Sequence, residues 1–214
     1  MADTDHWIHR RVAVIGGGLL GIRIAGELAL QGCTVHIYDH NPLTIQTIHS
    51  IIEAHFQELR DNNLLPTHLN IKGEVIADGL LSSAVADADI VLEAVNENIS
   101  IKNSIFRDIA SICSTDTLLC TSTLTLPMED IFDGVPHRER TLGVRFLFPV
   151  YLIDSVEVST WDATAGNTLE KIGAFLKAIK KKTFQREFGE YPRKLNKEEA
   201  LENQKQFFCH KKPI

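Results

Sequence analysis

The stretch Arg11-Val-Ala-Val-Ile-Gly-Gly-Gly-Leu-Leu-Gly21 decides the fold of this chain. Its first five residues are mostly apolar and include two β-branched valines, which predicts a buried parallel strand. A glycine-rich turn follows, and we predict that residues 19–30 form a helix. A strand, a tight turn and a helix in this order predict the first βα unit of an α/β domain.

The glycines of this turn have a spacing with a mechanical reason. Gly16, Gly18 and Gly21 fit the pattern G-x-G-x-x-G. The first glycine makes the tight turn, the second lets the backbone approach a pyrophosphate, and the third lets the helix pack on the strand. A phosphate then lies on the amide groups of the first helical turn, which includes Leu19 and Leu20. The turn therefore predicts a dinucleotide site.

An acidic residue stands where such a site needs one. The predicted second strand, residues 34–38, ends at Asp39. This carboxylate lies about 20 residues past the glycines, where it would bind a ribose hydroxyl. Because Asp39 would repel a 2′-phosphate, it favours NAD over NADP. The alternative interpretation is a glycine-rich turn that no longer holds a cofactor.

Predicted helices and strands alternate along the rest of the chain up to residue 180. The other predicted helices cover residues 43–60, 82–87, 100–113 and 164–180, with a helical turn over 127–132. The other predicted strands cover residues 89–93, 117–120, 141–147 and 155–158, and a short strand lies within 71–76. This alternation predicts a doubly wound, mostly parallel sheet with helices on both faces, as one Rossmann domain over residues 1–185.

Composition excludes several classes of protein. The chain has 214 residues, of which 44% are apolar and 23% are charged, as is usual for a globular domain. Its cysteines form no C-x-x-C pair and its histidines have no metal-ligand spacing, so we predict no metal site. No apolar run is long enough for a bilayer, and the N-terminus lacks a signal core, so the expected location is the cytoplasm.

The end of the chain, residues 186–214, differs from the body. From residue 177 onward the sequence contains 11 lysines and arginines and five acidic residues, a net charge of +6. The whole chain has a net charge of −6, so residues 1–176 carry −12. We predict a short irregular, basic and aromatic tail, with at most one short helix over 198–206. The simplest interpretation is a solvated tail. A protein partner is the alternative, and the absence of an RNP-type pattern disfavours nucleic acid.

Three segments together resemble the 3-hydroxyacyl-CoA dehydrogenase family, which includes lambda-crystallin. They are Val14-Ile-Gly-Gly-Gly-Leu-Leu-Gly21, Val91-Leu-Glu-Ala-Val-Asn-Glu-Asn98 followed by Lys102, and Gly143-Val-Arg-Phe-Leu-Phe-Pro149 running to Val158. The resemblance covers roughly residues 10–185 and keeps its internal spacing. It implies NAD as the cofactor, and it implies that Glu97 and Lys102 lie beside the nicotinamide ribose.

The catalytic residues of the family do not carry over. The family motif is G-x-H-F-F-N-P, in which the histidine is the general base and a later glutamate orients it. Glu157 matches that glutamate, whereas Arg145 stands at the histidine position. Leu124 stands at the catalytic serine and Phe148 at the asparagine. An arginine cannot release its proton, so we expect an ion pair between Arg145 and Glu157, with anion binding by Arg145 as the alternative.

These departures set the functional expectation. A general base contributes about 10²–10⁴-fold to a rate, so we predict an NAD(H)-binding protein with weak or no dehydrogenase activity. One alternative is an active NAD-dependent oxidoreductase on a 3-hydroxyacyl or other small hydroxy-acid substrate, with a substrate carboxylate meeting Arg145. Another is a scaffold module that docks through the tail.

The resemblance also raises an expectation about coenzyme A. In the family a serine and a lysine on the helix after the acidic residue contact this group, and here the two positions are His55 and Asn62. The family's second, all-helical domain forms its dimer and closes the substrate cleft, and this sequence stops before it. We therefore expect weakened acyl-CoA binding and no dimer of the family type.

Overall fold

A computed structural model describes residues 10–65 and 71–186. Within these residues, the strands are β1 (Arg11–Ile15), β2 (Thr34–Tyr38), β3 (Glu74–Asp78), β4 (Ile90–Glu93), β5 (Leu118–Thr121), β6 (Thr141–Phe146), β7 (Ser155–Ser159) and β8 (Lys182–Arg186). The helices are α2 (Leu19–Gln31), α3 (Pro42–Asp61), α4 (Leu81–Val85), α5 (Ile99–Ile112), α6 (Met128–Ile131) and α7 (Gly166–Ala178), with a 3₁₀ turn at Arg138–Arg140.

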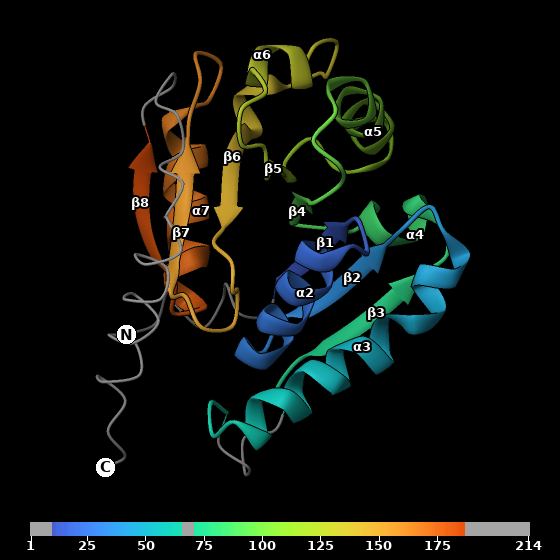
Figure 1. Ribbon diagram of the computed structural model, residues 1–214. Coiled ribbons are helices and arrows are strands. Elements are labelled where there is room, and N and C mark those ends of the chain that lie inside the picture. The colour runs from blue at the N-terminus through green and yellow to red at the C-terminus, as the bar shows by residue number, and fades with distance from the viewer. Residues whose placement is uncertain (1–9, 66–70, 187–214) are drawn as a thin grey trace.

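The strands form one sheet in the order β3-β2-β1-β4-β5-β6-β7-β8 (Figure 1). The pairs from β3 to β6 are parallel, β7 is antiparallel to β6, and β8 is parallel to β7. The order reverses between β1 and β4, which makes this the switch point where open α/β sheets bind ligands. We call the edge where β1, β2, β4, β5 and β6 end the carboxyl edge.

Helices cover both faces of the sheet, because the central strands are buried on both sides. Val12 and Val14 of β1 face one apolar core with α2, α3 and α7. Ala13 and Ile15 face a second core with α4, α5 and α6. A strand that alternates between two cores has a continuous apolar sequence, as β1 does. The predicted doubly wound α/β fold is therefore confirmed.

Local signals place two helix starts at the carboxyl edge. The side chain of Asn41 accepts a hydrogen bond from the amide of Leu43 at 3.0 Å, and Pro42 occupies the first turn of α3. The side chain of Asn98 accepts a hydrogen bond from the amide of Ile101 at 3.1 Å at the start of α5. Such caps satisfy amides that have no partner inside the helix.

The structure differs from the sequence prediction most clearly at the last strand; in addition, the short strand expected within 71–76 is Glu74–Asp78, and the 3₁₀ turn Arg138–Arg140 has no predicted counterpart. Periodicity fades after residue 182, yet Lys182–Arg186 forms β8, which pairs with β7 in the register Glu157↔Phe184. A five-residue edge strand is stabilised by its neighbour rather than by its own pattern, so its sequence gives little signal. The tail beyond Arg186, including the helix expected over 198–206, lies outside the described residues. None of the described helices is long and apolar enough to cross a membrane.

Candidate functional site

The glycine turn after β1 has the geometry that its spacing predicts. Gly16 has a φ of +113°, and a Cβ there would lie 2.6 Å from the carbonyl oxygen of Ala94. A Cβ on Gly21 would lie 1.9 Å from the carbonyl oxygen of Gly16. A Cβ on Gly18 would meet nothing within 4 Å. The fold itself therefore requires Gly16 and Gly21, whereas the space beside Gly18 is open to a ligand.

The helix that follows this turn presents amides with no helical acceptor. The first backbone hydrogen bond of α2 runs from the amide of Ile22 to the carbonyl of Gly18 at 3.1 Å. The amides of Leu19, Leu20 and Gly21 therefore have no partner within the helix. No acidic residue lies in this first turn. The positive end of the helix dipole adds to these donors, so the turn suits a phosphate.

Asp39 is held against the glycine turn. Its Oδ2 accepts a hydrogen bond from the amide of Gly17 at 2.7 Å, and its Oδ1 accepts one from the amide of Asn41 at 2.8 Å. His40 lies on the solvent side, with Nδ1 3.4 Å from Oδ1. Each carboxylate oxygen has a second lone pair. The side chain is therefore fixed in direction and can still accept a hydrogen bond from a ligand hydroxyl.

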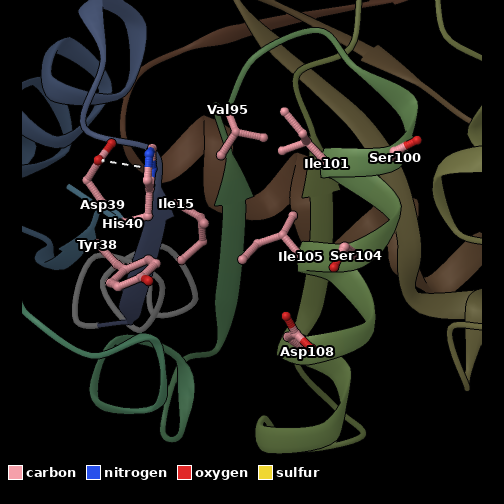
Figure 2. A pocket seen from close by; sticks show the side chains of 11 residues that line it. Ile15, Tyr38, Asp39, His40, Val95, Ser100, Ile101, Ser104, Ile105 and Asp108 are labelled. Carbon is pink, nitrogen blue, oxygen red and sulfur yellow. Dashed lines mark ion pairs between the residues drawn. The ribbon is translucent and has the colours of Figure 1, made fainter.

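A cavity of about 400 Å³ opens between the ends of β1 and β2 and the side of α5 (Figure 2). This volume lies within the range of sites for small ligands. It adjoins Gly16 and Asp39, and Figure 2 shows α5 forming the opposite wall. The residues that line it are Ile15, Gly16, Tyr38, Asp39, His40, Val95, Ser100, Ile101, Ser104, Ile105 and Asp108.

Lys102 is the centre of a buried polar cluster behind the next loop. Its Nζ lies 2.7 and 2.8 Å from the two carboxylate oxygens of Glu93 and 3.3 Å from Oε2 of Glu97. Glu93 also accepts hydrogen bonds from the hydroxyl of Thr121 and the amide of Val95, both at 2.7 Å. Burial raises the pKa of Glu93, and Lys102 is the strongest of the contacts that oppose this shift. The sequence analysis does not predict Glu93 as a site residue. The only sign of its role in the sequence is that it is a charged residue at the end of an otherwise apolar strand.

Glu97 joins this cluster to the loop after β5. One of its carboxylate oxygens accepts hydrogen bonds from the hydroxyl of Thr123 at 2.7 Å and from the amides of Leu124 at 2.7 Å and Thr125 at 3.1 Å. Burial alone would raise the pKa of Glu97, but these bonds and the charge of Lys102 outweigh it and hold the pKa below its ordinary value. The structure thus brings the predicted residues Glu97 and Lys102 into contact.

Arg145 and Glu157 form the expected ion pair. They are direct partners across β6 and β7. The Nε of Arg145 donates to Oε1 of Glu157 at 3.3 Å, and Nη2 contacts Oε2. Their side chains are 18% and 5% exposed. A carboxylate that is this close and this buried largely neutralises the arginine, which leaves Arg145 poorly placed to bind a second anion.

Two apolar side chains are exposed in the loops that follow β5 and β6. Leu124 follows β5 and is 42% exposed, and Phe148 follows β6 and is 54% exposed. The guanidinium carbon of Arg23 lies 5.2 Å from the centre of the Phe148 ring. The Nη1 of Arg23 donates to the carbonyl of Leu19 at 3.0 Å, so this cation is directed toward the start of α2.

The positions expected to meet coenzyme A lie on α3 and offer little to an anion. The Nδ1 of His55 is buried without a hydrogen-bond partner among the described residues, and burial, followed by the charge of Arg23, lowers the pKa of His55. The side-chain amide of Asn62 donates to the carbonyl of Glu58 at 2.8 Å at the end of the helix. A lowered pKa keeps the His55 imidazole uncharged near neutral pH.

Comparison with known proteins agrees with this geometry. A model of the 3-hydroxyacyl-CoA dehydrogenase NAD-binding domain matches residues 11–186. The chain belongs to this family. The residues also fit NAD, because the glycine turn leaves open space for a phosphate beside amides that lack a helical acceptor, and Asp39 lies next to a cavity.

Relatives from several organisms match most of this chain. The human mitochondrial hydroxyacyl-coenzyme A dehydrogenase is 29% identical over 190 residues, which is 84% of this chain and 60% of that protein. A rice peroxisomal fatty acid beta-oxidation multifunctional protein is 30% identical over 173 residues, which is 80% of this chain and 24% of that protein. The 3-hydroxybutyryl-CoA dehydrogenase structure from Escherichia coli has a TM-score of 0.75 at 26% identity, covering 84% of this chain and 38% of that one.

One relative is named for a different substrate. The 5-formyl-3-hydroxy-2-methylpyridine 4-carboxylate 5-dehydrogenase of Mesorhizobium japonicum is 29% identical over 170 residues, which is 79% of this chain and 55% of that protein. A solved structure of an enzyme of this activity, titled an NAD⁺ dependent dismutase, has a TM-score of 0.72 at 28% identity and covers 84% of this chain and 58% of that one. The chain thus spans between about a quarter and three fifths of the relatives it matches.

Proposed function

We propose that this chain binds NAD(H) at the carboxyl edge and oxidises 3-hydroxyacyl-CoA weakly or not at all. The ion pair between Arg145 and Glu157 is the observation that carries the second half of this proposal. It occupies the position that the resemblance assigns to the catalytic histidine and its orienting acid. An arginine side chain stays protonated and cannot accept the proton of a hydroxyl group.

The cofactor half of the proposal rests on the residues around the glycine turn. The amides of Leu19 and Leu20 would hold the pyrophosphate, and Asp39 would accept a ribose hydroxyl. Glu97 would line the nicotinamide side, and Lys102, whose side chain is fully buried between Glu93 and Glu97, would hold Glu97 in place there. Bound NAD supplies hydride acceptance. The chain's own residues bind and orient the cofactor.

The substrate half lacks polar groups where the family has them. Leu124 and Phe148 offer no hydrogen-bonding side chain to a thioester or its oxyanion. A general base contributes about 10²–10⁴-fold, and each hydrogen bond to a developing oxyanion about 10²–10³-fold. Together these losses support a residual rate far below that of a working dehydrogenase.

Two measurements test the proposal. NADH fluorescence is titrated against the chain, with Gly18→Ala as the binding-impaired control, and saturation is expected below millimolar cofactor. Turnover of acetoacetyl-CoA with NADH is then followed at 340 nm, and no more than a trace is expected. A lack of saturation at millimolar NADH would contradict the proposed binding of NAD(H). Turnover at the rate of an active family member would contradict the proposed loss of dehydrogenase activity.

A second candidate function is supported by Arg23. In this reading the chain is an NAD-dependent oxidoreductase on a small hydroxy acid, and the substrate carboxylate binds Arg23 rather than the already neutralised Arg145. No carboxylate in the described part of the chain lies within ion-pair distance of Arg23, and Phe148 offers an apolar surface beside it. A relative named for a pyridine carboxylate supports the same substrate class.

The test of this candidate is a screen of small hydroxy acids with NAD⁺. Turnover that Arg23→Gln abolishes, with NADH affinity unchanged, would support it. If no acid is oxidised, or if Arg23→Gln weakens NADH and leaves acid turnover intact, this candidate is wrong.

Two further predictions from the sequence stand as proposals. We propose a cytoplasmic location, and the named relatives include peroxisomal and mitochondrial proteins. Docking of a protein partner by residues 186–214 concerns a segment that lies almost entirely outside the described residues. Partner capture by the full chain but not by a chain ending at residue 186 would support docking.

A further inference from the structure

The cavity beside Asp39 has one polar end that the cofactor motif does not explain. Ile101, Ser104, Ile105 and Asp108 all face it from α5 (Figure 2). A helix rises 1.5 Å per residue, so this wall extends about 10 Å from Ile101 to Asp108. That length exceeds the long dimension of a purine, and the wall ends on a carboxylate.

The two ends of the cavity are set by different elements. Asp39, at the end of β2, marks the end nearest the glycine turn, where the ribose of a dinucleotide would lie. Ile15 and Ile105 line the middle, where they offer apolar contact to a flat ring. Asp108 lies farther along α5, away from the glycine turn (Figure 2). A base attached to that ribose would therefore point its far edge toward Asp108.

The Asp108 carboxylate has no hydrogen-bond or ion-pair partner in the part of the chain that the structure describes. Its backbone carbonyl accepts a hydrogen bond from Ser111, but its side chain is not engaged. A carboxylate in the wall of a site for an anionic ligand opposes binding unless the ligand brings a donor to it. Carboxylates only accept hydrogen bonds, so the matching ligand group is an N–H.

We propose that Asp108 selects the purine base of the cofactor by accepting a hydrogen bond from the 6-amino group of adenine. This inference rests on the proposed binding of NAD(H). A 6-oxopurine would place an acceptor oxygen against the carboxylate and would be rejected. Ser104, one turn earlier on the same wall, carries a hydroxyl that donates to a ring nitrogen of the same base. Asp108 is then a specificity-determining residue for the dinucleotide.

The test compares NADH with reduced nicotinamide hypoxanthine dinucleotide, which differs by an oxygen in place of the amino group. Both are titrated by fluorescence against the full chain. A hydrogen bond to a charged group contributes enough that the unaltered chain should prefer NADH by at least about tenfold. Asp108→Asn should bring the two affinities within about twofold, because its amide can serve either base.

Asp116→Asn is the matched control. Asp116 is also exposed and lies in the turn after α5, outside the cavity lining, so this variant changes the net charge equally and should keep the tenfold preference. Equal affinities in the unaltered chain, or an unchanged preference in Asp108→Asn, would overturn the assignment of Asp108 while leaving NAD binding intact. Failure of both dinucleotides to bind any variant would overturn the proposed function and this inference with it.

Discussion

The carboxyl edge has two halves that differ in how their charges are used. On the β1, β2 and α2 side, the amides after Gly18 have no helical acceptor, and Asp39 keeps lone pairs available beside a cavity. On the β6 and β7 side, Arg145 and Glu157 neutralise each other, and the exposed aromatic ring of Phe148 follows β6. The first half therefore keeps hydrogen-bonding groups available to a ligand, and we call it the binding half. In the second half the charged groups pair with each other, and we call it the ion-paired half. This difference agrees with the proposed function, in which the first half holds NAD(H) and the second half contributes little to catalysis.

The largest expected effect concerns the buried ion pair between Lys102 and Glu93, which lies between the two halves in the sheet order. Lys102→Met removes a fully buried cation and leaves Glu93 without its partner. Breaking a buried ion pair costs about 3–5 kcal/mol, and we expect a loss of that size in the free energy of unfolding, measured by urea denaturation. The double variant Glu93→Leu with Lys102→Met should lose less than Lys102→Met alone. A loss below 1 kcal/mol for the single variant would show that the pair contributes little.

The next effect concerns the ion pair between Arg145 and Glu157 on the β6 and β7 side. Arg145→Leu leaves the buried Glu157 without its arginine, and we expect roughly 2–3 kcal/mol of destabilisation, less than for a fully dry pair because Arg145 is partly exposed. Thermal or urea unfolding measures this change, and Arg145→Leu with Glu157→Leu serves as the matched control. If Arg145→Leu is as stable as the unaltered chain, the ion pair does not hold β6 and β7 together here.

The third effect belongs to the binding half and should leave stability unchanged. Gly18→Ala adds a methyl group into open space where a pyrophosphate would approach, so the Kd for NADH should rise about tenfold with Tm unchanged. Gly166→Ala, where a Cβ also meets nothing within 4 Å, should change neither quantity. Unaltered NADH affinity in Gly18→Ala would place the phosphates elsewhere.

The smallest effect is a pH dependence set by Glu97. Its pKa in the folded chain lies below its ordinary value, so its ionised form stabilises the fold at neutral pH. That contribution disappears as the pH falls below about 4 and through the folded pKa. Glu97→Gln should therefore lose stability less steeply than the unaltered chain as the pH falls below about 4, and the urea midpoint measured at each pH checks this. Identical profiles for the two chains would mean that the loop over 123–125 does not depend on this carboxylate.

Most of the fold could be predicted because its signals are local. The apolar run of β1, the Asn41-Pro42 start of α3 and the glycine spacing each specify backbone geometry within a few residues. The strand β8 had no such signal, because its stability comes from pairing with β7. Glu93 was missed for a related reason, since its partners come from three separate segments, and Thr121 is 28 residues away.

The sequence by itself determined the cofactor turn, because Gly16 and Gly21 are required by backbone geometry wherever this turn occurs. It also placed an acid at the end of β2 and an arginine twelve residues before a glutamate. Only the tertiary structure decided that this arginine is neutralised, that Lys102 is sealed between two carboxylates, and that Asp108 lines the cavity beside Asp39. Burial and distance set these properties, and they exist only after separate strands and helices have packed together.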